Sequence, residues 1–260
     1  MYEIDLDCIK RYPWELEFAD KQTYEMCVEA VRRDGMLLEH VKFDELNLTK
    51  EQLYNLCLIA VKQDGLSLKF IKEQTKEICL EAVKQDGFAL KFVKEQTEEI
   101  CIEAVKEYYL ALEFVKEQTE RICLEAVKEC HTALFYIKQQ TPEICIEAIK
   151  NNKNALCYVK NPTEDIYIEA LKQDKLIIKY IKDKEKYLDM FNIKYLEKQG
   201  KAREVIAIKE NGKWLFTLDC QYKITKDEFV DRIFNTDGGF NPEKGINIHR
   251  QIYLDFLKDF

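Results

Sequence analysis

The chain has 260 residues, of which 47% are hydrophobic and 34% charged, and its formal net charge is −8 at pH 7. This acidic balance argues against a general binder of nucleic acid or anionic membranes, which needs a strong basic excess. Only 8 Gly and 4 Pro are present, which favours a helical protein. No segment reads as a membrane span and the N-terminus does not read as a signal peptide, so we expect a cytoplasmic protein.

A 22-residue pattern repeats along most of the chain. One copy runs from Gln74-Thr75-Lys-Glu-Ile-Cys-Leu-Glu-Ala-Val-Lys-Gln-Asp-Gly87 through Phe88-Ala-Leu-Lys-Phe-Val-Lys-Glu95, and the pattern restarts at Thr97, Thr119, Thr141 and Thr163. Earlier copies cover residues 23–42 and 53–73, with an insertion at 43–48, and residues 6–18 form a degenerate first unit. We predict about eight repeats and a helical-repeat domain over residues 1–183.

Each unit carries the signals of two short helices. Thr75 is an N-cap residue, and apolar residues recur on one helical face at Ile78, Cys79, Ala82 and Val83. Asp86-Gly87 ends the first helix, with Gly87 expected in the left-handed conformation, and a second helix of about two turns follows. Such small hairpins bury their apolar faces only by stacking, which predicts an α-solenoid. The alternative, a leucine-rich repeat, needs a short strand in each unit.

The units contain Glu-Ile-Cys-Leu-Glu-Ala-Val-Lys, Asp-Gly and Ala-Leu-Lys-Phe-Val-Lys. In this they resemble the short repeats of unknown function found in many bacterial and giant-virus proteins. The resemblance covers most of residues 6–182. It implies a helical array and no particular activity, cofactor or binding residue.

Two kinds of residue form ladders at the repeat spacing. The first comprises Cys27, Cys57, Cys79, Cys101, Cys123 and Cys145. Equivalent positions in packed helices lie roughly 9–10 Å apart, too far for a disulfide or a shared zinc, so we expect reduced core residues, no metal and no cofactor. Lysines form the second kind and could follow a phosphate backbone. Glutamates three residues earlier pair with one lysine ladder, so nucleic acid is not expected as a direct ligand.

The turn between the two helices breaks the pattern in two successive units, and the Lys of the second helix is also replaced there. The departures are Tyr108-Tyr109 and Cys130-His131 at the turn, with Glu113 and Phe135 at the Lys position. Aromatic side chains at the centre of a surface are typical of protein-binding hot spots. We therefore predict that Tyr108, Tyr109, Glu113, His131 and Phe135 bind a partner; drift among repeats, with the rings packed back, is the alternative.

The C-terminal part has a different period. Residues 184–199 read as a helix, and two strand-like segments, 203–210 and 213–220, flank Asn211-Gly212, a strong hairpin signal. Thr225 and Glu228 form a capping box that opens a helix, and a last helix is expected over about 247–258. We predict a small α+β module at residues 184–260 that caps the array or forms a domain of its own.

Chemistry in this module would involve Asp237, His249 and Arg250. The segment matches neither a calcium loop nor a phosphate loop, and the chain shows no spacing typical of a catalytic triad. We expect no catalytic residue and treat these three residues, with Phe43 and Leu46 of the insertion, as secondary partner-binding candidates.

The leading hypothesis is a non-enzymatic scaffold that presents its repeat surface to another protein of unknown identity. The alternative is a small acidic inhibitor of a host protein, such as a nucleic-acid-processing defence enzyme, and a contiguous carboxylate face would favour it. A third hypothesis is an enzyme, which needs a concave pocket that joins Asp237, His249 and Arg250. The sequence does not indicate the oligomeric state.

Overall fold

The computed structural model describes residues 4–200, 202–218, 221–235 and 248–260. The chain divides into two compact units, Met1–Pro162 and Thr163–Phe260, and each is described by itself below. The repeat pattern ends near Asp183, so the last repeat is part of the second compact unit.

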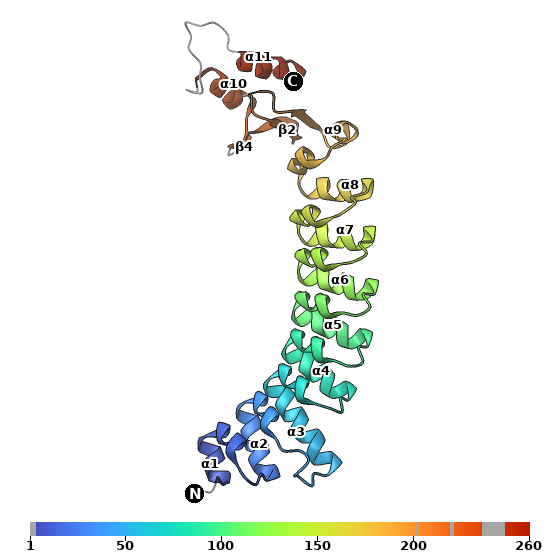
Figure 1. Ribbon diagram of the computed structural model, residues 1–260. Helices are drawn as coiled ribbons and strands as arrows, with labels where there is room; N and C mark the ends of the chain where they lie inside the picture. Colours follow the sequence, from blue (N-terminus) through green and yellow to red (C-terminus); the bar gives the residue numbers. More distant parts are fainter. Residues whose placement is uncertain (1–3, 201, 219–220, 236–247) are drawn as a thin grey trace. The chain divides into compact units, whose positions relative to one another are not determined.

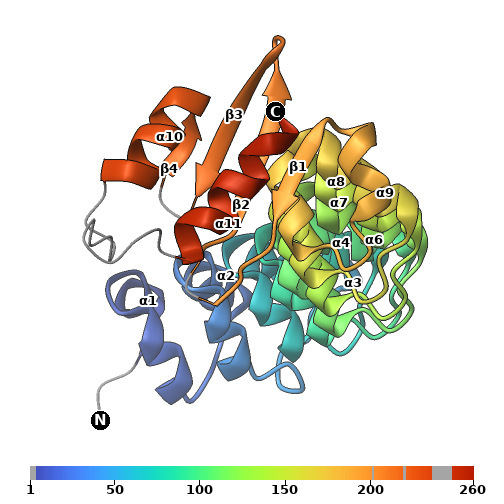
Figure 2. The same ribbon diagram turned by 90° about the horizontal axis from the view of Figure 1, so that it is seen from above.

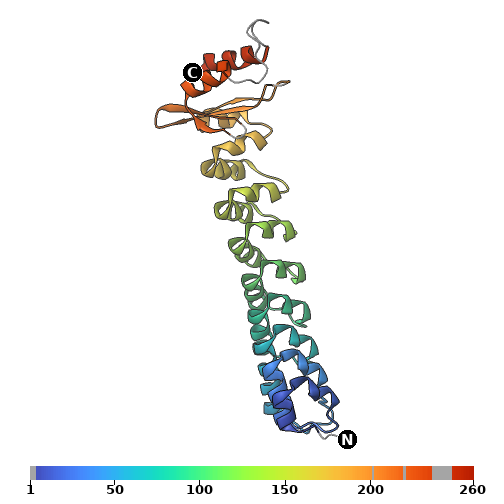
Figure 3. The same cartoon turned by 90° about the vertical axis from the view of Figure 1, so that its left-hand side faces the viewer.

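The first unit is a stack of seven repeats, each an α-helix followed by a 3-10 helix (Figure 1). The second helix of each repeat has six residues, about two 3-10 turns, as predicted in length. The two helices of each repeat lie in separate rows (Figure 3). The α-row consists of α1 Leu6–Arg11, α2 Tyr24–Arg33, α3 Lys50–Gln63, α4 Lys76–Gln85, α5 Glu98–Glu107, α6 Glu120–Glu129 and α7 Pro142–Asn151. The 3-10 row consists of η1 Pro13–Phe18, η2 Gly35–His40, η3 Gly65–Phe70, η4 Gly87–Phe92, η5 Tyr109–Phe114, η6 His131–Tyr136 and η7 Lys153–Tyr158.

The α-helices begin where the repeating threonine predicts. The hydroxyl of Thr75 accepts a hydrogen bond from the backbone N–H of Ile78 at 3.3 Å, and Thr97, Thr119 and Thr141 cap their helices in the same way. Pro142 occupies the first turn of α7, where its missing N–H costs nothing.

The core of the first unit follows the repeat. Ile78, Cys79, Ala82 and Val83 are buried, as are their equivalents in neighbouring repeats. Burial raises the pKa of Cys27 to about 12 and that of Cys57, Cys101 and Cys123 to about 11. These thiols therefore stay neutral and pack as small apolar groups. Among the described residues, no cluster of metal-ligating side chains occurs.

The glycine of the Asp-Gly turn has a different role from the one predicted. Gly35, Gly65 and Gly87 do not adopt positive φ. A Cβ atom on them would lie only 2.3 to 2.6 Å from a carbonyl oxygen of the next repeat, that of Ala60, Ala82 or Ala104. The residue must be glycine there because two backbones approach closely, and the left-handed expectation was wrong.

The aspartate before that glycine joins the two helices of the repeat. The Asp86 N–H donates to the carbonyl of Ala82 and ends α4, while its carboxylate accepts from the N–H of Phe88 at 2.8 Å and caps η4. One residue therefore satisfies backbone groups of both helices.

A repeating glutamine, which is not among the residues predicted from the sequence, connects successive repeats. The Gln96 amide donates to the carbonyls of Leu90 (3.3 Å) and Phe114 (3.0 Å), and its oxygen accepts from the N–H of Lys116 (3.0 Å). The thiol of Cys101 also lies 3.7 Å from this oxygen. Gln22, Gln74, Gln118 and Gln140 make equivalent bonds. Pro162 holds this position at the end of the first unit, and proline has no side-chain amide.

The insertion after Lys42 adds a turn and lengthens a helix. Residues 43–46 form a hydrogen-bonded turn in which the N–H of Leu46 donates to the carbonyl of Phe43 at 3.4 Å. The next helix, α3, has 14 residues where α4 has 10, and a Thr49–Gln52 capping box opens it.

The second unit begins with the last repeat and continues into an antiparallel sheet. Its elements are α8 Glu164–Gln173, η8 Lys175–Tyr180, α9 Glu185–Met190, β1 Ile193–Leu196, β2 Val205–Glu210, β3 Lys213–Leu218, β4 Gln221–Ile224, α10 Lys226–Asn235, α11 Ile248–Phe256 and η10 Leu257–Asp259. The four strands pair in the order β1-β2-β3-β4. Helices α10 and α11 lie on one face of this sheet (Figure 2). Among the described residues, no helix is long and apolar enough to cross a membrane.

The predicted hairpin and capping box are confirmed, but the helix expected over 184–199 is wrong in its second half. Asn211 and Gly212 both adopt positive φ, as a two-residue hairpin requires, and Glu228 and Thr225 cap α10 reciprocally. Helix α9 ends at Met190, Asn192 turns the chain at φ 54°, and Ile193 starts a strand that pairs with β2. Tertiary pairing therefore overrode a helical pattern.

The core of this sheet is aromatic. Phe216 on β3 stacks on Phe229 of α10 with ring centroids 4.8 Å apart, and Phe256 and Phe260 pack beside them. This cluster fixes α10 and α11 to the sheet and gives the second unit an apolar core of its own.

Candidate protein-interaction surface

An aromatic residue ends each 3-10 helix from η3 to η7. The positions are Phe70, Phe92, Phe114, Tyr136 and Tyr158, and all five side chains are half-buried. Because the 3-10 helices stack in one row, these rings line one face of the first unit. Each ring presents part of its surface to solvent.

In the third and fourth repeats a lysine lies close to this aromatic position. The ammonium of Lys69 lies 4.5 Å from the ring centre of Phe70, and that of Lys91 lies 5.9 Å from Phe92 and from Phe114. The residues at the lysine position in η5 and η6 are Glu113 and Phe135. Along the row, this repeat position therefore holds lysine in η3 and η4, a carboxylate in η5 and an aromatic ring in η6.

The predicted aromatic residues join into a chain of ring contacts. Tyr108 contacts Phe88 at 4.9 Å and Tyr109 at 5.7 Å between ring centres. Tyr109 then contacts Tyr136 at 6.5 Å, and Tyr136 contacts Phe135 at 5.2 Å. The contacts are edge-to-face, the geometry that aromatic pairs favour.

Phe88 also contacts Phe114, at 5.8 Å. We call this set of six rings the aromatic strip: Phe88, Tyr108, Tyr109, Phe114, Phe135 and Tyr136. The strip crosses η4, η5 and η6. Its most exposed members are Phe135, which is 69% exposed, and Tyr108, which is 39% exposed.

The structure therefore brings three of the five predicted residues into one surface and places the other two beside it. Tyr108, Tyr109 and Phe135 belong to the strip, and Glu113 precedes Phe114 on η5. His131 opens η6 and contacts Tyr158 of the next repeat at 6.1 Å. Packing among the rings and exposure to solvent occur together, and partner binding by these residues stays a prediction.

Sequence reasoning missed Phe88, Phe114 and Tyr136 as members of this surface. A signal was available for two of them, because Phe114 and Tyr136 belong to an aromatic ladder with the same spacing as the cysteines. Phe88 lies at a position that other repeats fill with Trp, Met, Leu, Thr or Asn, so only the fold shows that its ring reaches Tyr108.

Tyr108 and Cys130 also lack the cap that aspartate provides. Neither side chain accepts a hydrogen bond from the backbone of η5 or η6, whereas Asp64 and Asp86 cap η3 and η4. The centre of the array thus exchanges a backbone cap for aromatic surface.

The charges on the α-row are mixed and locally paired. Lys128 binds Glu125 at 2.8 Å, and this hydrogen bond holds the pKa of Glu125 below its ordinary value. Lys106 lies 3.8 Å from both Glu103 and Glu125, and Lys172 pairs with Glu169 at 3.4 Å in the last repeat. This row has no continuous basic stripe for a phosphate backbone.

The other lysine ladder bonds to the backbone. The ammonium of Lys116 donates to the carbonyl of Lys94 at 2.8 Å, and Lys94 donates in turn to the carbonyl of Lys72. Lys160 donates to the carbonyl of Ile137 at 3.1 Å. These lysines connect neighbouring repeats instead of forming a free cationic track.

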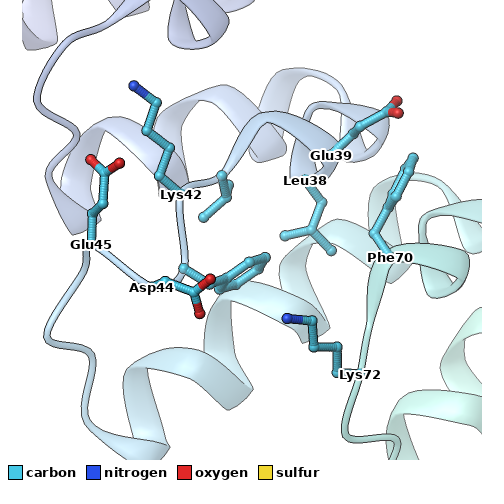
Figure 4. A pocket seen from close by; sticks show the side chains of 9 residues that line it. Leu38, Glu39, Lys42, Asp44, Glu45, Phe70 and Lys72 are labelled. Carbon is cyan, nitrogen blue, oxygen red and sulfur yellow. The ribbon is translucent and has the colours of Figure 1, made fainter.

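The insertion contributes to a surface pocket of about 390 Å³ in the first unit. Phe43 lines it, together with Leu38, Glu39, Val41, Lys42, Asp44, Glu45, Phe70 and Lys72. In Figure 4, Leu38, Glu39 and Phe70 lie on one side and Lys42, Asp44 and Glu45 on the other. Leu46, the other predicted residue here, is half-buried in the turn and does not line the pocket.

The C-terminal candidates are only partly within the described residues. Asp237 lies outside them. His249 and Arg250 are half-buried at the start of α11, and the Arg250 guanidinium lies 4.9 Å from the ring centre of Phe234 on α10. This contact packs α11 against α10 and stabilises the second unit.

A further exposed aromatic group lies in the first repeat and was not predicted. Tyr12, Trp14 and Phe18 are 50%, 57% and 63% exposed, and the rings of Tyr12 and Trp14 lie 5.6 Å apart. Tyr12 and Phe18 occupy the repeat positions of Tyr108 and Phe114.

Comparison with known families gives one match. Residues 54–97, 75–119 and 119–162 each match a domain of unknown function (DUF4116), so the family match follows the repeats from the third to the seventh. No curated protein and no solved structure matches the chain. The family supports the helical repeat and assigns no ligand or activity to it.

Proposed function

We propose that this protein is a non-enzymatic scaffold that binds another protein through the aromatic strip at the centre of its repeat array. The observation that carries the proposal is the exchange of the Asp-Gly turn and the covering lysine for exposed aromatic rings in adjacent repeats. Aromatic side chains dominate the energy of protein interfaces because they bury large apolar areas with few rotatable bonds.

Lysine–glutamate pairs interrupt the carboxylates of the α-row, which supports a scaffold over an acidic inhibitor, while Glu107 and Glu129 at the helix ends are exposed. A contiguous carboxylate face would favour the inhibitor, whereas Glu103 and Glu125 lie within reach of Lys106 and Lys128. The contact of Arg250 with Phe234 likewise gives its side chain a packing role, which favours binding over catalysis in the second unit.

The test compares partner binding by the wild type and by a Tyr109→Ala, His131→Ala double variant. A partner is first captured from host cells on the immobilised full chain and identified by mass spectrometry. Removing both rings should weaken its affinity about tenfold or more, while helix content and melting temperature stay nearly unchanged because both side chains are only half-buried.

A matched control changes two exposed lysines on the α-row, Lys84→Ala and Lys150→Ala, and should leave the affinity within about twofold. Equal affinity of the double variant and the wild type would contradict the proposed binding surface.

A further inference from the structure

We infer that the segment bound by the aromatic strip is basic, and that its lysine or arginine side chains lie over the rings beside Glu113. This inference rests on the proposed function and adds the chemistry of the partner. It follows from what the array does with the equivalent rings in other repeats.

The protein itself shows which group this aromatic position accepts. Lys69 lies over Phe70 at 4.5 Å, and Lys179 lies over Tyr180 at 4.8 Å in the last repeat. An ammonium is attracted to the negative face of an aromatic ring, by about 0.5–1 kcal/mol at exposed sites and more when water is excluded. The geometry of the repeat therefore places a cation against this ring when the sequence provides one.

At the centre of the array Lys91 lies 5.9 Å from Phe114, but the lysine position of η5 and η6 themselves holds no cation. Glu113 and Phe135 stand where Lys69 and Lys91 stand in η3 and η4, and among the described residues no cation lies over Tyr108, Tyr109 or Tyr136. A partner that supplies lysine or arginine here makes the contact that the third, fourth and last repeats make internally.

The carboxylates around the strip favour the same partner. Glu107, Glu113 and Glu129 are exposed, and in the described part of the chain none of them forms an ion pair. The nearby lysines are already engaged, since Lys106 and Lys128 pair with Glu125 and Lys116 donates to a backbone carbonyl. The rim is therefore negative, and an acidic segment would be repelled from it.

The first experiment is a fluorescence-anisotropy titration at low salt with a labelled peptide of about twelve residues that alternates lysine and alanine. The matched probe alternates glutamate and alanine. Both titrations use full-length protein in a Glu17→Lys background, because Glu17 and Phe18 repeat the Glu113–Phe114 arrangement in the first repeat.

Glu113→Lys places a cation of the protein itself beside the strip and should weaken the binding of the basic probe about tenfold. Glu117→Lys makes the same change of charge at an exposed position that differs from the Lys69 and Lys91 position, and it should weaken binding less than about twofold. Lys91→Glu uncovers Phe92 and should strengthen binding. Equal effects of Glu113→Lys and Glu117→Lys, or equal binding of the acidic probe, would overturn the inference.

A second experiment separates this inference from the proposed function. A random peptide library is selected on the wild type and counter-screened on Tyr109→Ala, His131→Ala. Enriched peptides that are basic and lose affinity with Glu113→Lys support both ideas. Enriched peptides that depend on the strip but are neutral or acidic overturn the basic partner alone.

If no peptide depends on the strip, both ideas fail. The molecular mass of the protein in solution tests a further occupant. If this mass rises with protein concentration and returns to the monomer value in Glu113→Lys, a second copy of the chain occupies the strip. That result also overturns the inference.

Discussion

Repeats 2 to 4 and repeats 5 and 6 differ at the turn between their two helices. The first group has Asp-Gly there. The aspartate caps the 3-10 helix, and the glycine lets a backbone carbonyl of the next repeat approach closely. The second group has Tyr108-Tyr109 and Cys130-His131, which do neither. Helix α6 accordingly packs less extensively on η5 than α5 does on η4.

The comparison shows that one turn position can hold either a packed Asp-Gly or larger side chains at the surface, and binding is the role that we propose for the latter. Where the turn is Asp-Gly, its residues are used within the stack, and in repeats 3 and 4 a lysine lies over the neighbouring ring. Where it is aromatic, the backbone cap is lost and ring surface is gained. Proteins commonly give up some stability at their functional sites, which agrees with the binding role proposed for the central repeats.

The largest effect should come from Gly65→Ala. The new Cβ would meet the carbonyl oxygen of Ala82 at 2.3 Å, and relief requires moving the backbone of two repeats, at a cost of about 3 kcal/mol. His131→Ala at the equivalent position of repeat 6 should change stability by less than about 0.5 kcal/mol. Urea unfolding followed by circular dichroism measures both. Similar costs at the two positions would show that the turns do not differ in packing.

The glutamine between repeats should matter equally in both groups. Gln74→Leu leaves the carbonyl of Phe92 and the N–H of Lys94 without their partner. Gln140→Leu does the same to the carbonyl of Tyr158 and the N–H of Lys160. Each should lower the free energy of unfolding by about 2 kcal/mol. A cost confined to Gln74 would mean that the connection between repeats is also weaker in the second group.

Asp86→Ala should remove the cap of η4 and cost about 1 kcal/mol. Tyr108 already lacks a cap, so Tyr108→Ala at the same position should leave the backbone of η5 unchanged and affect only its ring contacts. Hydrogen exchange of the first N–H groups of η4 and η5 distinguishes these cases, since protection should fall in Asp86→Ala alone. A fall in both variants would refute the difference in capping.

The smallest effect is a gain in stability from Ser67→Ala. The Ser67 side chain is fully buried, and its hydroxyl has no hydrogen-bond partner among the described residues. Ala89 and Ala111 occupy the same position in the next repeats, so the alanine fits. Removing the unpaired hydroxyl should stabilise the protein by about 0.5–1 kcal/mol, measured as a higher urea midpoint. A lower midpoint would indicate an unrecognised partner for the hydroxyl.

Much of the first unit was predictable because the sequence is its own alignment. Threonine caps, the buried Ile-Cys-Ala-Val face and the short second helix repeat often enough to be read directly. The close approach at Gly87 was not predictable, because it depends on the position of the next repeat. The strand at Ile193 was missed for the same reason, since its hydrogen bonds come from β2.

For the surface, the departures at Tyr108, Tyr109 and Phe135 were visible against the repeat consensus. Phe88 was not, because its position tolerates several apolar residues and only the folded array shows its contact with Tyr108. Charge patterns predicted the pairing of Lys128 with Glu125, but not the use of Lys116 as a donor to the backbone.

The central claim is that the strip binds a partner because the array leaves these rings uncovered. It is tested most directly by restoring both lysines in one variant, Glu113→Lys with Phe135→Lys, and measuring its affinity for a strip-dependent peptide. Both positions are exposed, so the unfolding midpoint should stay the same while the affinity falls about tenfold or more. Unchanged affinity in the folded variant would contradict the account.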